Sequence, residues 1–353
     1  MEVRNLKWIH SIVFLLLIFP IVLRQKKAPG KVESNIQRKL EYSSYITVKF
    51  KNDVLYDCGF NCFDSEYRKE ISYIIYENKS YTQEEYLKIN AGKSIDIHFS
   101  YPIKSLENFF NAYDFVDIFG YEIISIDFSH FYSSNLVNAS YMFYGCMSLE
   151  SIDITNFITT NIKNMSFMFN QCINLKSLNV SSFNTSLVED MQYMFGYCES
   201  LESIDLSNFD TSSVTYMYDM FCECKNLLSL NLSNFDTSSV KIMNNMFNGC
   251  NKLISLDLSN FDTSSVIDMS NMFYYCNSLT SLNISNFDTS SVIDMSNMFY
   301  YYNSLTSLNI SNFDTSSVID MSNMFYHCDA LTSIDVSNFD TSLVISMKNM
   351  FSY

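Results

Sequence analysis

Carboxylate and amide side chains recur every 26 residues, and they are the groups in this chain most able to do chemistry. Each follows an apolar residue that itself follows a serine, as in Ser281, Leu282 and Asn283. A regular row of such oxygens could hold Ca²⁺ or a glycan, and its acidic members could hold a basic peptide. The column consists of Asp127, Asp153, Asn179, Asp205, Asn231, Asp257, Asn283, Asn309 and Asp335.

A solvated face that is kept polar for solubility explains the same column equally well. The flanking column is serine throughout, at Ser125, Ser151, Ser177, Ser203, Ser229, Ser255, Ser281, Ser307 and Ser333. A face tuned to one ligand would differ between copies, and this one hardly does. The uniformity favours avidity or bulk architecture over a single shaped pocket.

Cysteine offers two further kinds of chemistry. Cys58 and Cys62, in the stretch DCGFNCFD, are candidates for a disulfide in an exported protein. Other cysteines recur once per 26 residues, whereas a metal site needs paired cysteines at short spacing, so we expect buried free thiols and no metal site. Tyr302 fills one slot of this column, which agrees with a packing role. The column is Cys146, Cys172, Cys198, Cys224, Cys250, Cys276 and Cys328.

The sequence carries no recognisable catalytic motif. It contains no glycine-rich phosphate loop, no nucleophile elbow and no paired histidine site. The four histidines, at positions 10, 98, 130 and 327, are scattered along the chain. We therefore predict a protein without enzyme activity and without a cofactor.

The elements that position these side chains are repeats of constant length. Nine phenylalanines, from Phe131 to Phe339, are each separated by 26 residues without insertion. Methionine–phenylalanine pairs such as Met272-Phe273 recur nine times at the same interval. Two successive copies, residues 260–285 and 286–311, differ at one position, where Cys276 is replaced by Tyr302. Each unit must therefore pack against the next in one register.

Two hydrophobic periods alternate within one unit. Around Leu282 and Ile284 the period is two, which indicates a strand with one buried face. Residues 263–276 place Val266, Met269, Met272, Phe273 and Cys276 on one side of a predicted helix of about three turns. Asp262, Thr263, Ser264 and Ser265 lie where they could cap the start of this helix. Each repeat is therefore predicted to be a strand followed by a helix.

Stacking such units predicts a curved array. Strands stack at about 4.8 Å, whereas helices cannot approach much closer than about 8–10 Å. The strands would then line the concave side and the helices the convex side. The column of Asp and Asn side chains described above would lie on the concave strand face.

The stretch MFYYCNSLTSLNI (272–284) resembles the leucine-rich repeat of BspA-like surface proteins. The 26-residue spacing and the motif NFDTSSV look like the variant in mycoplasma and Gram-positive surface proteins, and in protist expansions of this repeat. The resemblance covers about residues 123–353. It implies a curved leucine-rich-repeat-like solenoid on secreted or surface proteins, with binding or adhesion roles and no catalysis. The usual asparagine ladder is replaced by phenylalanine, such as Phe287 after Leu279, which implies aromatic packing of that turn.

Charge is distributed unevenly along the chain and limits the partners. The net charge is −16, and residues 123–353 hold 22 acidic but only 6 basic residues. Nucleic acid is a poor partner for such a chain, because phosphate contacts need a basic footprint. Apolar residues make up 48% of the 353 residues, enough for a large core.

The N-terminus predicts entry into the secretory pathway. Arg4 and Lys7 precede an apolar run over residues 8–23, which suits a signal peptide and is short for a membrane span. No clean cleavage site follows, so an uncleaved signal-anchor stays open, and membrane contact is expected only through this run. We predict a leader over residues 1–31, a small α+β cap over 32–122 and the repeat solenoid over 123–353. Within the cap, residues 45–50 and 95–99 are predicted strands and 106–115 a predicted helix.

The predicted function follows from these features together. We expect an α/β, leucine-rich-repeat-like solenoid of nine strand–helix repeats that is secreted or on the cell surface. It would bind an extracellular protein or glycan, and its uncapped last repeat could pair with another chain. An intracellular interaction scaffold is the main alternative. Binding to ice or a mineral surface through the Ser/Asx rows is a third reading.

Overall fold

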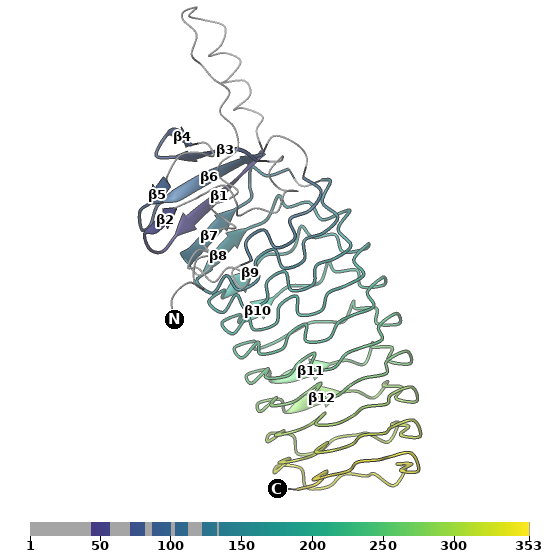
Figure 1. The fold of residues 1–353 in the computed structure, drawn as a ribbon. Helices are drawn as coiled ribbons and strands as arrows, with labels where there is room; N and C mark the ends of the chain where they lie inside the picture. Colours follow the sequence, from purple (N-terminus) through teal and green to yellow (C-terminus); the bar gives the residue numbers. More distant parts are fainter. Residues whose placement is uncertain are drawn as a thin grey trace, which may run out of the picture.

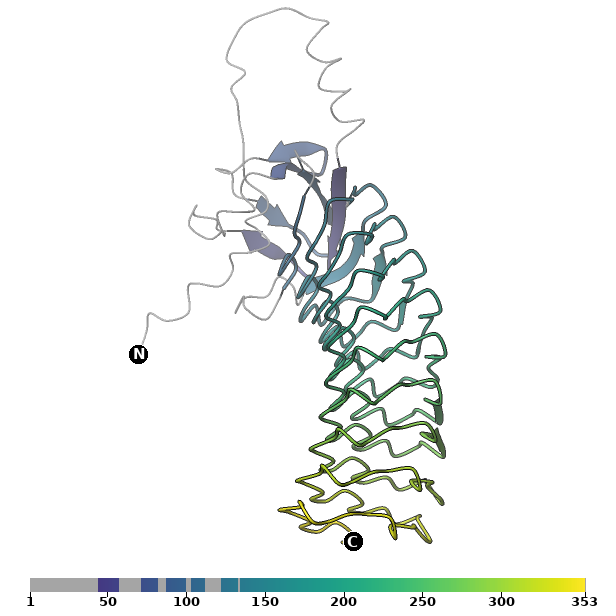
Figure 2. The same ribbon diagram turned by 90° about the vertical axis from the view of Figure 1, so that its right-hand side faces the viewer.

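The computed structural model describes residues 44–56, 71–81, 87–99, 103–111, 122–132 and 134–352. Figure 1 shows a twisted sheet at the start of this region, followed by a long stack of coils that runs to the C-terminal end. The stack bends along its length, as the turned view in Figure 2 shows.

The N-terminal sheet contains both predicted strands. Residues 45–50 lie in β1 and residues 95–99 in β6, so these two predictions are confirmed. A separate small sheet pairs β2 (Val54–Tyr56) with β5 (Leu87–Ile89). The larger sheet has the order β4-β3-β6-β1-β7-β8, made of β1 (Ser44–Phe50), β3 (Ile71–Tyr76), β4 (Lys79–Tyr81), β6 (Ser94–Phe99), β7 (Ile123–Asp127) and β8 (Ser151–Asp153).

This sheet runs directly into the stack of coils. β1 pairs antiparallel with β6 on one side and with β7 on the other, and its alternate residues Ile46, Val48 and Phe50 are fully buried. β7 then pairs in parallel with β8, so that Ser125 lies opposite Ser151, one repeat later. The period-two pattern of these residues therefore places the first coil in register with the sheet.

The repeats form coils that hydrogen-bond to one another in parallel. β9 (Ser177–Leu178) pairs with β10 (Ser203–Ile204), and β11 (Ser255–Asp257) pairs with β12 (Ser281–Asn283). A second ladder, made of isolated parallel bridges, joins the coils at another place in the repeat. It runs from the pair Ser105 and Asn138 to the pair Asp320 and Ser346. Each residue thus lies opposite its counterpart in the neighbouring coil.

The predicted helix of the repeat is wrong. No helix occurs in residues 134–352, where the methionine–phenylalanine segment forms successive tight turns instead. Asn271 and Tyr275 have left-handed φ angles of 56° and 57°, which interrupt a right-handed helix every four residues. The strand–helix, α/β leucine-rich-repeat-like solenoid expected from the sequence is therefore corrected to a stack of strand-and-turn coils.

Backbone hydrogen bonds explain why turns replace the helix. The N–H groups of Met272, Tyr274 and Cys276 bond three residues back within the coil, at 3.1–3.3 Å. The alternate N–H groups of Asn271, Phe273 and Tyr275 instead donate to the next coil, at 2.9–3.0 Å. A helix would keep all of these bonds within one repeat and leave none for its neighbour.

Coil spacing makes the same choice necessary. The stacked rings from Phe143 to Phe351 have centroids 5.1–6.0 Å apart from one coil to the next. Helices need about 8–10 Å between axes, so they cannot stack at this spacing. The predicted cause of curvature, wide helices opposite narrow strands, is therefore absent from residues 134–352, although the stack does bend.

Residues 105–111 extend the stack rather than forming part of a helix. Ser105 bridges to Asn138, and Leu106, Asn108 and Phe110 donate their N–H groups to the next coil. Asn108 has the left-handed φ of 58° seen at the same place in every coil, and the ring of Phe110 stacks 5.7 Å from that of Phe143. The predicted helix over 106–115 is wrong for its described part, which is a partial coil that covers the first repeat.

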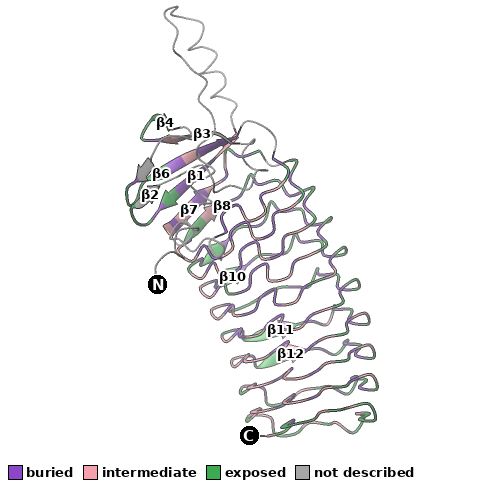
Figure 3. Ribbon diagram, viewed as in Figure 1, coloured by how far each residue is buried: buried purple, intermediate pink, exposed green. Residues whose placement is uncertain are grey.

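The predicted core positions are nevertheless correct. Val266, Met269, Met272, Phe273 and Cys276 are all fully buried, and the corresponding residues of the other coils follow the same pattern. Figure 3 shows buried segments alternating with exposed ones around each coil. In a series of tight turns, as in a helix, residues three apart lie on the same side. Either structure therefore produces this spacing.

Two ladders of polar side chains, one of threonine and one of asparagine, also join neighbouring coils. Thr185, Thr211 and Thr237 are buried, and each hydroxyl donates to a carbonyl of the next coil at 2.8 Å. Asn208 and Asn234 donate through Nδ2 to carbonyls of the preceding coil. The turn after each strand is therefore held by asparagine hydrogen bonds as well as by phenylalanine, which corrects the expectation of aromatic packing alone.

Tyr302 shows what happens when the cysteine slot is filled differently. Its ring packs edge-on against Phe299 and is 1% exposed, and its buried hydroxyl has no hydrogen-bond partner. Each coil from Cys146 to Cys276 makes turn bonds through the N–H of the cysteine and of the leucine three residues later. Neither bond forms at Tyr302 and Leu305, and in the following coil only the bond from Leu331 to Cys328 forms.

The predicted leader over residues 1–31 and its apolar run at 8–23 lie outside the described residues, as do Cys58 and Cys62. In the part of the chain that is described, no helix has the length and apolar character that a membrane crossing requires.

Candidate functional site

The Asp and Asn column predicted as the ligand-binding face lies on the surface, where its side chains hold turns. In each case Oδ1 accepts the backbone N–H two residues later, as in Ser207 to Asp205 at 2.9 Å and Ser285 to Asn283 at 3.3 Å. Hydrogen bonds from the side chain and the N–H of the serine two residues later lower the pKa of Asp257 and Asp335, and those from the N–H and side chain of Ser207 lower that of Asp205. The same bond forms at Asp153, Asn179, Asn231 and Asn309. Ligand binding here stays a prediction.

The cysteine column is buried among the coils from Cys146 to Cys276, and Cys328 is partly buried. Cys172, Cys198 and Cys224 are free thiols with no exposed surface, and each donates to the carbonyl of a phenylalanine 29 residues earlier at 3.2–3.3 Å. Burial raises the pKa of these thiols, so they are poor nucleophiles. Among the described residues no group of three His, Cys, Asp or Glu side chains could hold a metal ion.

The coils differ from one another at one short segment. Three later coils read DMSN at this place, in residues 268–271, 294–297 and 320–323. The middle coils read DMQY at 190–193, YMYD at 216–219 and IMNN at 242–245. The methionine stays buried in all of them, so the variation is confined to the side chains that face outward.

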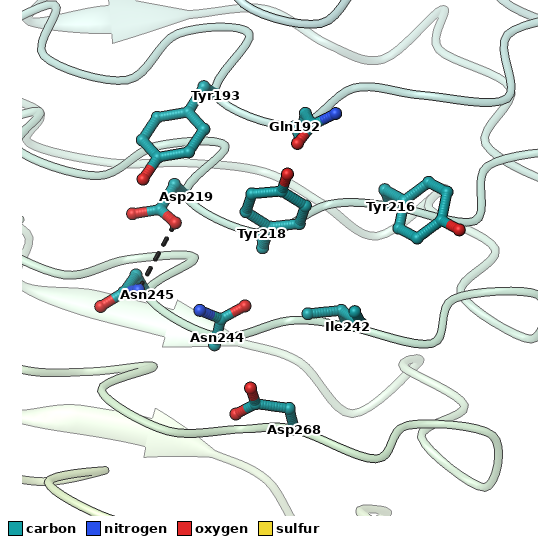
Figure 4. Close-up of a pocket in the computed structure, with 9 residues that line it drawn as sticks. All are labelled: Gln192, Tyr193, Tyr216, Tyr218, Asp219, Ile242, Asn244, Asn245 and Asp268. Carbon is teal, nitrogen blue, oxygen red and sulfur yellow. Dashed lines mark hydrogen bonds between the residues drawn. The ribbon is translucent and has the colours of Figure 1, made fainter.

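These three segments line a hollow of about 490 Å³. Figure 4 shows its side chains projecting from neighbouring coils around a common space. Eight of its nine lining residues belong to the variable segments, and the ninth comes from the next coil. They are Gln192, Tyr193, Tyr216, Tyr218, Asp219, Ile242, Asn244, Asn245 and Asp268. We call this space the hollow.

Asp219 lies at the inner side of the hollow and is 4% exposed. Asn245 donates to its Oδ2 from 3.4 Å, and the Tyr193 hydroxyl also donates to this carboxylate. The thiol of Cys222 is a third donor. The backbone φ of Asp219 is 57°, which is left-handed, like that of the corresponding residue in each coil. The carboxylate is therefore held in one position by its neighbours.

The electrostatics of the hollow are those of a carboxylate taken partly out of water. Burial raises the pKa of Asp219 to about 6, against the lowering effect of its hydrogen bonds. Burial and the nearby Asp219 charge raise the pKa of Tyr193. Burial, followed by Asp190 and Asp219, raises the pKa of Tyr218. A buried acid with a raised pKa beside a cleft is typical of a functional site.

Aromatic rings form the outer part of the hollow. Tyr193 and Tyr218 meet edge to face, with ring centroids 5.7 Å apart, and Tyr216 is 41% exposed. Tyr193 also ends a stack of rings that begins at Tyr141 and passes through Phe167, with centroids 4.4 and 4.6 Å apart. Flat apolar faces and polar groups therefore meet in one concave space, as in ligand sites generally.

Reasoning from the sequence missed this site, because it looked for divergence among the strand side chains. The signal was present in the turn segment, where DMSN gives way to DMQY, YMYD and IMNN. This variation did not indicate a site, because the segment was predicted to form one face of a helix. Only the turn geometry shows that these residues face the same space in consecutive coils.

The repeats match a protein family, described as Mycoplasma protein of unknown function, DUF285, over residues 104–229, 137–257, 199–282 and 277–353. Together these matches cover more than half of the chain. The chain belongs to this family. It is a repeat family typical of mycoplasma surface proteins, and the identification as a BspA-like leucine-rich repeat is not supported beyond that. No curated protein and no solved structure matches the chain.

Proposed function

We propose that this DUF285-family chain is a secreted or cell-surface protein that binds a protein ligand at the hollow and catalyses no reaction. The carrying observation is that three consecutive coils, at the segment where later coils repeat DMSN, place different polar and aromatic side chains around one hollow. Variation in outward side chains on a constant scaffold is typical of a binding surface. The uniform columns supply the rigid support that such a surface needs.

Family membership and charge support the extracellular part of the proposal. The family is typical of mycoplasma surface proteins, and the apolar run over residues 8–23 suits a signal peptide or signal-anchor. The net charge of −16 favours solubility and suits a long-range attraction for basic partners.

Localisation tests this first part. A C-terminal tag on the full chain should be removed by protease added to intact cells, and the mass of the mature chain should show whether the leader is cleaved. A tag that is protected in intact cells, on a chain that retains Met1, would instead favour the intracellular scaffold.

Replacing the hollow by the sequence of its sister coils tests the binding site. The variant combines Tyr216→Asp, Tyr218→Ser, Ile242→Asp and Asn244→Ser. It gives both coils the amino acids that a later coil has at the equivalent positions, 268 and 270. We expect unchanged folding and a loss of ligand binding of roughly tenfold or more on protein arrays and host-cell surfaces, as for other central contact residues. The matched control is Asp262→Asn, outside the hollow and outside the Asp/Asn column, at a position that Asn184 occupies in an earlier coil. Equal loss in both, or no loss in either, would contradict the proposal.

A further inference from the structure

We infer that the hollow receives a cationic side chain, lysine or arginine, from a basic segment of a protein ligand. This inference rests on the proposed function, because it names the chemistry of the ligand that the hollow binds. Three independent features of the hollow carry it: a carboxylate that the fold does not need, an excess of hydrogen-bond acceptors, and exposed aromatic faces.

The carboxylate of Asp219 has no structural role that asparagine would not fill. Asparagine occupies the same position at residues 245, 271, 297, 323 and 349, with φ angles of 55–56° against 57° for Asp219. Asparagine is also among the side chains that best tolerate this left-handed conformation. Burying a charge costs stability, so an acid at this one place is a feature that folding alone would not select.

The hydrogen-bond donors around Asp219 already have acceptors, whereas one hydrogen-bond acceptor nearby has no donor. The Tyr193 hydroxyl and Asn245 Nδ2 donate to Asp219, and Gln192 Nε2 donates to Asp190 at 2.7 Å. Gln192 Oε1 is buried and has no hydrogen-bond partner. A ligand group that only donates fits this arrangement, and ammonium and guanidinium groups are of that kind.

No basic side chain competes for the site. None of the nine lining residues is basic, and Asp219 and Asp268 contribute two carboxylates. Lys225 of the same coil as Asp219 is engaged by Glu199 at 2.8 Å and Glu223 at 3.2 Å. A cation that enters the hollow would therefore find an uncompensated carboxylate in a partly desolvated place.

The aromatic faces complete the match to a cation. Tyr216 is 41% exposed, and the rings of Tyr193 and Tyr218 stand at 86° to each other, so their faces point in different directions. A cation that lies over a tyrosine face within about 6 Å of its centroid is attracted by the ring quadrupole. Arginine gains additionally because its planar group stacks on such faces.

The test uses titration calorimetry on the full chain with defined peptide probes. The probes are capped peptides with a central Arg-Arg or Lys-Lys pair in a Gly/Ser background, and a matched peptide in which citrulline replaces arginine. We expect the basic peptides to bind roughly tenfold more tightly than the citrulline peptide. Asp219→Asn should weaken them by a similar factor, whereas Asp262→Asn, which removes the same charge from an exposed place, should change affinity less than about twofold.

A pH series gives an independent reading. The titratable groups around Asp219 are Tyr193, Tyr218 and Asp268 in the hollow and Tyr197 and Cys222 beside it. Since the Asp219 pKa is raised to about 6, affinity should fall as the pH is lowered through 6. The Asp219→Asn chain should lose most of this pH dependence. The glutamates and the aspartates that hold turns are present in both chains, so their titration cannot cause a difference between the two.

Different failures have different meanings. Equal weakening of the basic peptides by Asp219→Asn and Asp262→Asn would show non-specific attraction to an acidic protein and would overturn the inference. Binding of a neutral glycan that the four-residue hollow variant abolishes would also overturn it, while leaving the hollow as the binding site. Ligand binding that survives the hollow variant would overturn the proposed function itself.

Discussion

Asp219 is the residue at which folding and function are most clearly opposed. Its raised pKa means that the folded chain holds a proton more tightly than the unfolded chain. Folding stability therefore falls as the pH rises from about 4 to 6, and the deficit is fully present above that range. The asparagines of later coils avoid this cost at the same backbone position.

Asp219→Asn should accordingly stabilise the protein near neutral pH. Because the pKa rises from 3.8 to about 6 at a partly buried site, we expect a gain of about 1–2 kcal/mol in unfolding free energy at pH 7.5. The gain should disappear at pH 4, where the wild-type carboxyl is protonated in the folded state. Urea unfolding at the two pH values measures the difference. An equal effect at both would show that charge is not the cause.

The ladders are the elements that hold the coils in register. Thr185 is 1% exposed, and its hydroxyl donates to the carbonyl of Asp210 and accepts the N–H of Asp210, both at 2.8 Å. One buried hydroxyl thus satisfies two backbone groups of the next coil. The sequence predicted aromatic packing of the turn after each strand, because phenylalanine replaces the asparagine of the usual leucine-rich repeat, and the structure adds these polar contacts.

Thr185→Val should therefore destabilise the stack although it preserves side-chain shape. Removing the hydroxyl leaves the N–H and C=O groups of Asp210 without their partner, at a cost of about 1–3 kcal/mol. Thr185→Ser keeps the hydroxyl and loses one methyl group, so it should cost less, about 1 kcal/mol. Thermal unfolding of the three chains gives the order. A valine chain as stable as the serine chain would show that the ladder contributes only packing.

At the scale of the whole molecule, stability is shared between neighbouring coils. Each coil contacts the one before and the one after through backbone bonds, aromatic rings and side-chain ladders. Stability in such an array is approximately a sum of unit and interface contributions. The coil that contains Tyr302 is less regular than those from Cys146 to Cys276, because it lacks both turn bonds that they make.

Deleting residues 286–311 should leave a folded protein. The deletion removes one whole coil and joins Ser285 to Asn312, which restores the same sequence register. We expect one cooperative unfolding transition, with a transition temperature within a few degrees of the full chain's. Deleting residues 287–311, one residue fewer, is the control and should unfold the following coils. Similar behaviour of the two chains would contradict a stack in fixed register.

The sequence by itself determined the repeat length, the core columns and two strands of the N-terminal sheet. Val266, Met269, Met272, Phe273 and Cys276 are buried as their spacing predicts. Their conformation could not be read from that spacing, because helices and successive tight turns both return to one side after three residues. Recurrent Asn and Gly at left-handed positions, such as Asn271 and Gly249, were the available sign of turns.

Only the tertiary structure decided between helix and turns, and with it the place of the site. Neighbouring coils lie 5.1–6.0 Å apart at the phenylalanine ladder, too close for helices, so alternate backbone N–H groups bond between coils instead. That choice turns residues 192, 218 and 244 toward one space, although 26 residues separate each from the next. The sequence contains the variable side chains, but long-range backbone pairing brings them together.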